Sequence, residues 1–217
     1  QAIRAANDHP GGDSITFAIP TGDPGYDPET GQWTIALTDV LPTLSDDDWL
    51  IVDATPLGPG DCSSYVIIDA TNASYGLPPV TGANKEFKGL VIKNAKIHGV
   101  YIHGTGAQGN QLTCSYVVSN TVDGVRIGGG ATGNSIGSTA ASAPNVISFN
   151  GGDGVHITDS GTSNNTVVNN HIGTDKAGTT AWANGGYGVH INNGAATNAI
   201  GLVMTGGSHL ISGNTQG

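Results

Sequence analysis

The chain has 217 residues, of which 17 are acidic and 7 basic, and its net charge is −10 with histidine neutral. The few basic residues are spread along the chain, which argues against nucleic acid and anionic membranes as partners. No apolar run approaches the roughly 18 residues of a membrane span. The abundance of Ile and Val argues against disorder. An acidic, lysine-poor composition is typical of a secreted or cell-surface protein, which sets the expected location.

The first 12 residues, QAIRAANDHPGG, are the only helix-like segment of the sequence. Alanine and isoleucine favour a helix at its start, and residues 7–12 end it. A stack of strands exposes its end, so we expect this segment to form a short capping helix.

Four β-branched runs follow the cap, each bounded by Pro, Gly or Asp turns. They predict strands at residues 15–19, 33–37, 49–54 and 65–70. The connection at 21–32 is rich in turn residues, and we expect a hairpin-like or projecting loop there.

From residue 87 onward, three short phrases recur in a fixed order. The first phrase is HGVYI (98–102), DGVRI (123–127), DGVHI (153–157) and YGVHI (187–191). The second is NQL (110–112), NSI (134–136), NTV (165–167) and NAI (198–200). The third is SYVVSN (115–120), NVISFN (145–150), NHIGTD (170–175) and HLISGN (209–214). The strands keep their length while the turns absorb insertions, and the longest insertion, 174–186, is expected to project.

Three short strands per repeat, with no helices between them, predict one coil of a solenoid. Alternation within GVxI points Val and Ile inward and the middle residue outward. We expect the glycine to permit a turn conformation that other residues resist. The stacked asparagines 110, 134, 165 and 198 are expected to form a ladder of side-chain amides.

The predicted fold class is all-β, as a single right-handed parallel β-helix with three strands per coil and a short N-terminal capping helix. One domain is expected over residues 1–217. Within it, residues 1–12 form the cap, the coils run from about residue 15 to 217, and the C-terminal coil is incomplete.

Several stretches carry a resemblance to a known family. The opening QAIRAANDHPGGDSITFAIP and the phrases NVISFNGGDGVHI, NHIGTDKAGTTAWANGGYGVHI and HLISGN resemble bacterial secreted or surface parallel β-helix repeat proteins with a CSLREA-type N-terminus. The likeness covers nearly the whole chain. It departs at the start, where the cysteine segment of that pattern would lie upstream of Gln1, and at residues 46–48 and Cys62. The resemblance implies a right-handed parallel β-helix of the pectate-lyase-like superfamily, secreted or surface-displayed, and implies no particular activity.

Cys62 and Cys114 invite a disulfide, but they lie about two coils apart, or roughly 9.6 Å at 4.8 Å per strand. A bridge needs Cα atoms within about 7 Å, so a disulfide and two buried thiols both stay open. The consecutive residues Asp46, Asp47 and Asp48 form either a solvated turn or a weak Ca²⁺ site. No other cofactor is predicted.

One face of the predicted solenoid gathers residues that suit a binding site. The outward residues of the first phrases line up as a ladder: Tyr101, Arg126, His156 and His190. Asp123 and Asp153 stand three residues before two of them, either as paired carboxylates of the kind used in glycoside hydrolysis or as turn residues. Tyrosine would stack on sugar rings, and Arg126 and the histidines would contact hydroxyls or carboxylates. No residue is assigned a catalytic or metal-binding role.

The favoured function is a non-catalytic extracellular structural or adhesive module. An exposed coil edge can template another strand, so the expected partners are further copies stacked end to end into filaments, or neighbouring domains of a larger surface protein. The alternative is a carbohydrate-active enzyme, either a polysaccharide lyase or a glycoside hydrolase, or a polysaccharide-binding protein. Either would use the face from Tyr101 to His190.

Overall fold

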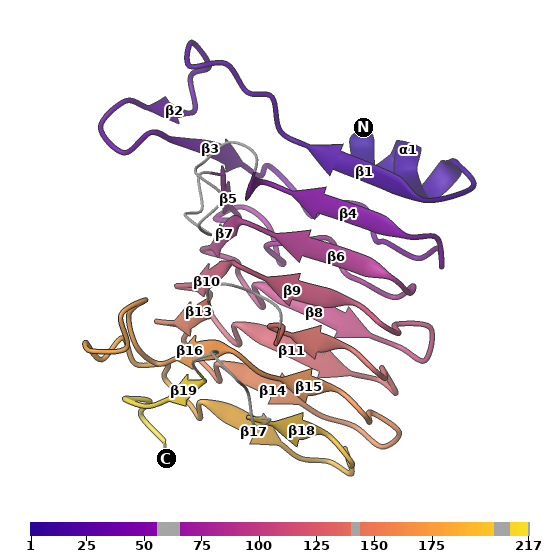
Figure 1. The fold of residues 1–217 in the computed structure, drawn as a ribbon, viewed down its shortest axis with the longest axis vertical. Helices are drawn as coiled ribbons and strands as arrows, with labels where there is room; N and C mark the ends of the chain where they lie inside the picture. The colour runs from indigo at the N-terminus through magenta and orange to yellow at the C-terminus, as the bar shows by residue number, and fades with distance from the viewer. Residues whose placement is uncertain (56–65, 140–143, 202–208, 217) are drawn as a thin grey trace.

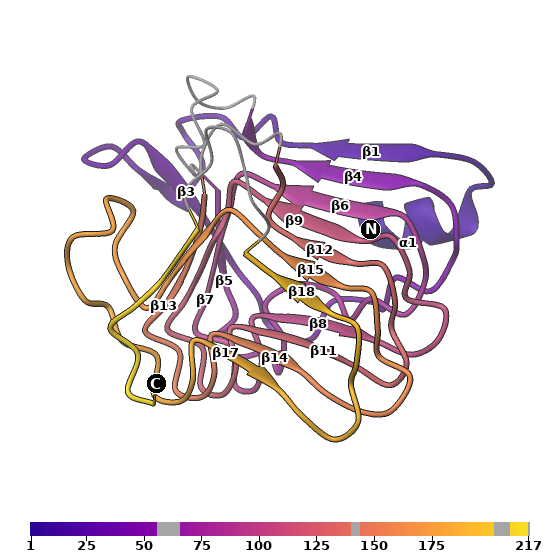
Figure 2. The ribbon, with the colours of Figure 1, turned by 60° about the horizontal axis from the view of Figure 1, so that its bottom comes forward.

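Two stacks of short strands run the length of the molecule and a third, shorter stack begins at β8, as the computed structural model shows (Figure 1). The structure describes residues 1–55, 66–139, 144–201 and 209–216. Seen more nearly along the stack, the three sheets surround a common core (Figure 2). From β6 onward the chain passes from sheet A to sheet B to sheet C and back to sheet A, whereas the described strands of the earlier passages lie in sheets A and B alone. We call each passage a coil.

The strands assort into sheets by their place in the repeat. Sheet A contains β1 (Asp13–Thr16), β4 (Leu50–Asp53), β6 (Lys85–Lys88), β9 (Gln111–Thr113), β12 (Ser135–Ile136), β15 (Thr166–Val167) and β18 (Ala199–Ile200). Sheet B contains β2 (Tyr26–Asp27), β3 (Gln32–Ala36), β5 (Val66–Asp69), β7 (Leu90–Lys93), β10 (Tyr116–Val118), β13 (Asn145–Ser148), β16 (Asn170–Ile172) and β19 (Leu210–Ile211). Sheet C contains β8 (Val100–His103), β11 (Val125–Gly128), β14 (Val155–Ile157) and β17 (Val189–Ile191). Among the described strands, no sheet closes on itself.

The three recurring phrases supply the three sheets, in the order predicted from the sequence. First phrases form sheet C, second phrases sheet A and third phrases sheet B. The expected inward and outward alternation is confirmed in β11, where Val125 and Ile127 are fully buried and Arg126 between them is partly exposed. In the next coil they pair in register with Val155 and Ile157. The core is therefore a column of aliphatic side chains, one layer per coil.

The early strands also form, with shifted bounds. The strand expected at 15–19 is β1, which begins at Asp13, because the Asp13 N–H donates to the Trp49 carbonyl 2.8 Å away. The expected hairpin at 21–32 is confirmed, since β2 pairs with β3 in antiparallel fashion.

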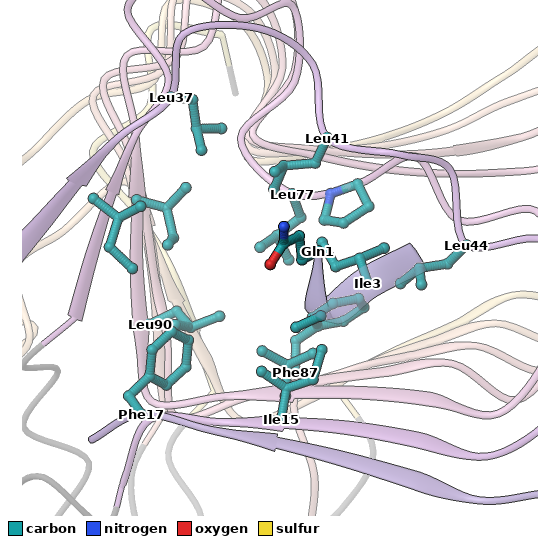
Figure 3. Close-up of a pocket in the computed structure, with 15 residues that line it drawn as sticks. Gln1, Ile3, Ile15, Phe17, Leu37, Leu41, Leu44, Leu77, Phe87 and Leu90 are labelled. Atoms are coloured by element: carbon teal, nitrogen blue, oxygen red, sulfur yellow. The ribbon is translucent and has the colours of Figure 1, made fainter. Parts of the chain in front are cut away.

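The predicted helix is α1 (Ala2–Asp8), which lies at the β1 end of the stack (Figure 1). It has no side-chain N-cap, and at seven residues it is too short to be stable alone. Ile3 instead joins apolar residues of the first coils around a cavity of about 190 Å³, and packing holds the helix there (Figure 3). Within the described part of the chain, no helix is long and apolar enough to cross a membrane.

Buried asparagine side chains link the coils. The predicted ladder at the start of sheet A is confirmed, with amide-to-amide hydrogen bonds of 2.9 Å from Asn110 to Asn134, from Asn134 to Asn165 and from Asn165 to Asn198. A second ladder, which the sequence analysis did not identify, joins Asn120, Asn150, Asn184 and Asn214 at 2.8–3.0 Å. Each amide also satisfies backbone groups that no strand pairs.

The glycines of the first phrases serve a purpose other than the one expected. The expectation that they supply an unusual turn conformation is wrong, because Gly99, Gly124, Gly154 and Gly188 are not among the residues with positive φ. A Cβ on Gly124 would instead lie 2.7 Å from the Asn150 amide nitrogen and from a backbone oxygen. Glycine is needed there because the second asparagine ladder runs directly beneath it.

The insertion at 174–186 projects from the stack beside sheet B (Figure 1). Thr174 and Ala181 form an antiparallel bridge at its base, and the Trp182 ring stacks on Phe149 at 5.2 Å. Asn184 then rejoins the second ladder, so the insertion leaves the register of the next coil unchanged.

Replacing Asn134 by Ala should destabilise the fold by about 2–4 kcal/mol, because several buried backbone and amide groups lose their partners together. The measurement is the urea unfolding midpoint followed by circular dichroism. Asn72→Ala, in an exposed turn, is the matched control and should change stability by less than about 0.5 kcal/mol. Equal stability of the two variants would contradict a structural role for the ladder.

Candidate functional site

The ladder predicted on sheet C is in register. Arg126 pairs with Tyr101 on one side and with His156 on the other, and His156 pairs with His190. All four side chains are partly exposed, as outward positions should be. Structure and sequence therefore agree on which residues share this face.

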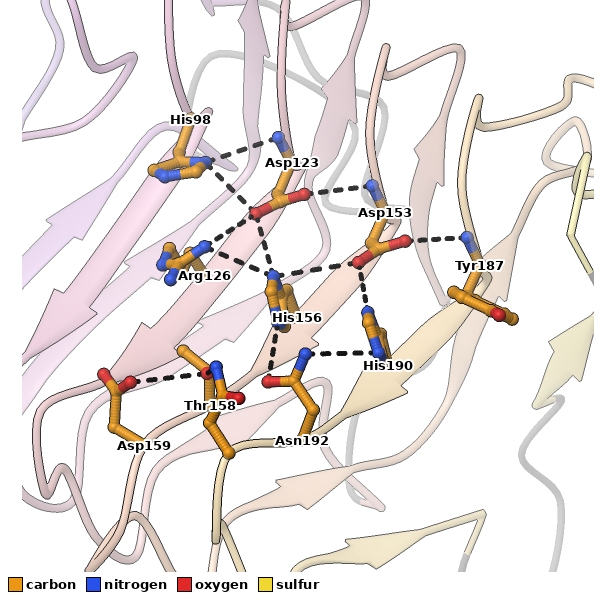
Figure 4. A network of polar contacts seen from close by, with 11 residues as sticks. His98, Asp123, Arg126, Asp153, His156, Thr158, Asp159, Tyr187, His190 and Asn192 are labelled. Atoms are coloured by element: carbon orange, nitrogen blue, oxygen red, sulfur yellow. Dashed lines mark hydrogen bonds and ion pairs between the residues drawn. The ribbon is translucent and has the colours of Figure 1, made fainter.

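Asp123 is the centre of the network, and it is almost fully buried (Figure 4). Its Oδ2 atom lies 3.3 Å from His156 Nδ1 and 3.5 Å from Arg126 Nη1. Burial alone would raise the pKa of Asp123. Hydrogen bonds from His156 and from the Asp153 N–H outweigh that effect and hold the pKa below its usual value. Asp123 is thus a buried carboxylate that orients both Arg126 and His156.

Asp153 repeats the arrangement one coil later. Its Oδ2 atom lies 2.8 Å from His190 Nδ1 and 3.7 Å from His156 Nδ1. The other oxygen, Oδ1, accepts the Tyr187 N–H at 2.7 Å. In the same way, Asp123 Oδ1 accepts the Asp153 N–H at 3.0 Å. The interpretation of these aspartates as turn residues is confirmed, because Oδ1 of each fixes the turn of the next coil. Their role as paired carboxylates stays a prediction.

His156 and His190 form a stacked pair, with ring centroids 4.8 Å apart and planes 9° from parallel. Asn192 contacts both rings, since its Oδ1 lies 3.2 Å from His156 Nε2 and its Nδ2 lies 3.2 Å from His190 Nε2. The hydrogen bond to Asp123 raises the pKa of His156 above its usual value, against the effect of burial. The sequence analysis missed Asn192, and its position directly after the VHI strand was the available signal.

His98 occupies the place of Asp123 one coil earlier. Its Nδ1 accepts the Asp123 N–H at 3.3 Å, which requires an unprotonated nitrogen. Burial lowers the pKa of His98 to about 4. This histidine is therefore a neutral structural acceptor.

The aromatic end of the face extends one coil beyond the predicted ladder. Tyr75 stacks on Tyr101 with centroids 5.2 Å apart, and Tyr101 stacks on His103 at 4.4 Å. Burial raises the pKa of Tyr101, so its hydroxyl stays neutral. The sequence analysis missed Tyr75, although Tyr75-Gly76 has the same residue-glycine form that opens each first phrase.

The charged end opens into a shallow depression of about 370 Å³. Five of the six predicted site residues line it, and Tyr101 does not. The remaining lining residues are Val122, Gly152, Tyr187 and Gln216. Arg126 and the histidines can hydrogen-bond a polar ligand there. One donor atom each from Asp153, His156 and His190 lies within 4.8 Å of the other two, a spacing that a metal ion could bridge.

The cluster at residues 46–48 is more than a solvated turn. Lys85 is inward-facing and almost fully buried, and its Nζ lies 2.6 Å from Asp46 Oδ1 and also donates to the carbonyls of Asp46 and Asp48. Asp47 and Asp48 accept backbone N–H groups through their own carboxylates, at 3.2 and 3.1 Å. The three carboxylates thus have separate protein partners, and the weak Ca²⁺ site stays a prediction.

Cys114 is disulfide-bonded. Cys62 lies outside the described residues. The predicted pairing of Cys62 with Cys114 therefore lies partly outside the described residues.

Comparison with known proteins finds no family model, curated protein or solved structure that matches the chain.

Replacing Lys85 by Met should cost about 2–4 kcal/mol of stability, because Asp46 and two carbonyls lose a charged hydrogen-bond donor. Chemical denaturation at pH 7 measures the loss. Lys96→Met, at an exposed lysine, is the control and should cost less than about 0.5 kcal/mol. A Lys85→Met variant as stable as the parent would show that the buried ion pair contributes little.

The His98 imidazole should not titrate above about pH 5, which NMR of its ring protons measures directly. The pKa is near 6.5 in the unfolded chain and about 4 in the folded one, so the unfolded chain binds more protons between these values. The contribution of His98 to the free energy of unfolding is therefore at its maximum above pH 6.5. It falls by about 2–3 kcal/mol as the pH drops toward 4. His98→Gln keeps an acceptor for the Asp123 N–H and should flatten that slope. A measured pKa near 6.5 would refute the assignment.

Proposed function

We propose that this chain is a single right-handed parallel β-helix of the pectate-lyase-like kind, and that it serves as an adhesive module outside the cell. In this proposal the sheet C face binds polysaccharide. Repeated passage through sheets A, B and C, with parallel pairing between coils, supports the fold. The crossover rule for parallel strands supports the right-handed sense. The acidic, lysine-poor composition supports an extracellular location, and the resemblance described above agrees with it.

The observation that carries the binding proposal is the continuous row of aromatic and ionisable side chains on sheet C. From Tyr75 to His190 the row crosses four coil spacings, or about 19 Å at about 4.8 Å each. Tyr75 and Tyr101 stack on each other and both stay partly exposed, so this aromatic pair can contact a sugar ring. Arg126 and His156, held in place by Asp123, supply hydrogen bonds to hydroxyl groups.

Electrostatics favour a neutral or weakly charged polysaccharide over a strong polyanion. The chain carries a net charge of −10, which repels polyanions over distance at low salt. Within the site, two carboxylates already pair with Arg126 and the histidines, so little positive charge is left for an anionic sugar. A polysaccharide that is recognised through its hydroxyl groups, with binding energy from stacking on aromatic rings, fits this charge distribution.

Self-association is a second proposal, supported by the coil that contains β17, β18 and β19. Ile191 is 40% exposed there, whereas its counterpart Ile157 in the preceding coil is fully buried. Ile211 is likewise 41% exposed, and its sheet B neighbour Ile172 is fully buried. These strand edges can pair with another strand, whether from a second copy or from a further segment of a longer chain. Electron microscopy and light scattering of the purified chain distinguish filaments from single particles.

Binding is tested by affinity electrophoresis and calorimetry against a panel of neutral and acidic polysaccharides. We expect a neutral polysaccharide to bind, and Tyr101→Ala and Arg126→Ala each to weaken binding about 10-fold or more. The matched controls are Tyr116→Ala and Lys93→Ala, which remove an outward tyrosine and an outward cation from sheet B.

Three results separate the alternatives. No binding to any polysaccharide, or binding that Tyr101→Ala and Arg126→Ala leave intact, would refute the proposed role of this face. Preferential binding of acidic polymers would overturn the charge argument alone. Release of shorter sugars during incubation would show that the chain is an enzyme and not an adhesive module.

A further inference from the structure

Three potential metal ligands converge at the charged end of the sheet C face. They come from Asp153, His156 and His190, each of which places one donor atom within 4.8 Å of a donor atom from the other two (Figure 4). The carboxylate oxygen is 2.8 Å from one imidazole nitrogen and 3.7 Å from the other. In a tetrahedral site with bonds of about 2.0–2.1 Å, neighbouring ligand atoms are about 3.3 Å apart. The two measured separations bracket that value.

The surrounding structure already orients each ligand. Asp153 Oδ1 is bonded to the Tyr187 N–H, which directs Oδ2 toward the histidines. Asn192 Oδ1 accepts from His156 Nε2, which leaves Nδ1 of the neutral His156 ring without a proton, as a metal ligand must be. Asn192 Nδ2 instead donates to His190 Nε2, so the His190 Nδ1 proton, which faces Asp153 Oδ2, is displaced when a metal ion binds. Metal-bound histidines commonly donate their second ring N–H to an outer acceptor, and the contact between His156 Nε2 and Asn192 Oδ1 fits that pattern.

The ligands are accessible and the local charge is compatible with a cation. The side chains of Asp153, His156 and His190 are 11%, 14% and 32% exposed, and all three line the depression. The His156 and His190 rings are stacked 9° from parallel, so one ring must rotate before both nitrogens can bind the same ion, and His190 is the more exposed of the two. Arg126 lies 3.3 Å from His156 Nδ1, but Asp123 lies 3.5 Å from the same guanidinium nitrogen and balances its charge.

We infer that Asp153, His156 and His190 bind one divalent transition-metal ion of the zinc class. Two imidazoles and one carboxylate are the donors that zinc, nickel and copper prefer, whereas calcium and magnesium prefer sites made of oxygen. The three ligands leave the side facing the depression open, where water or a ligand oxygen completes the coordination. This site does not depend on polysaccharide binding by the same face.

The test is calorimetric titration of the untagged, metal-free chain with Zn²⁺. We expect one ion per chain, and no displacement by a tenfold excess of Ca²⁺ or Mg²⁺. His156→Ala, His190→Ala and Asp153→Asn should each weaken the affinity about 10-fold or more, because losing even an outer partner of a ligand commonly costs 10- to 100-fold. Asp153→Asn keeps an oxygen for the Tyr187 N–H, so it tests the ligand without removing the turn contact.

His103→Ala is the matched control, because His103 lies on the same sheet but outside the three-residue cluster. Circular dichroism verifies the fold of every variant, and ¹⁵N NMR of the parent chain should show Zn²⁺ on the Nδ1 atoms. Absence of stoichiometric binding overturns the inference. So does binding that survives loss of His156 and His190, or that His103→Ala removes equally.

Arg126→Met gives an independent check. Because it removes a positive charge close to His156 Nδ1, it should tighten Zn²⁺ binding severalfold. An unchanged or weaker affinity contradicts placement of the ion at this nitrogen.

Discussion

Hydrogen bonding between side-chain amides of successive coils is the interaction on which the rest of this structure depends. Strands of two to five residues pair too briefly to fix a register alone, and the turns between them leave many backbone groups without strand partners. The asparagine ladders supply those partners inside the stack, where an unmet polar group would cost 1–3 kcal/mol. They also require close approach, which explains why glycine stands beside them at Gly124 and its counterparts.

The candidate site follows from this regular stacking. Because Asp123 and Asp153 occupy the same position in consecutive coils, each can bond the backbone of the following coil through Oδ1. Their remaining oxygens then lie beside the outward residues of sheet C, where Arg126, His156 and His190 meet them. Polar groups are thus placed at a spacing set by the backbone, and their identity alone varies from coil to coil.

The sequence was sufficient to predict the three phrases, the sheet each one forms and the ladder face. Period-two alternation and repetition report directly on backbone geometry. The sequence was not sufficient to predict residues that depart from their usual burial or from their usual place in the repeat. Lys85 faces inward, although lysine rarely does. Asn184 belongs to the second ladder but is displaced by the insertion at 174–186, and Asp175 stands at the equivalent position in the sequence repeat.

The two oxygens of Asp153 have different roles. Oδ1 holds the turn of the next coil, and Oδ2 faces the candidate site. Asparagine at this position could still hold the turn of the next coil through its carbonyl while losing the anionic oxygen that faces His156 and His190. A lineage could therefore gain or lose reactivity on this face by exchanging aspartate and asparagine, coil by coil, with the backbone undisturbed. The atoms that hold the stack together and the atoms that face the site are thus separate even within one residue.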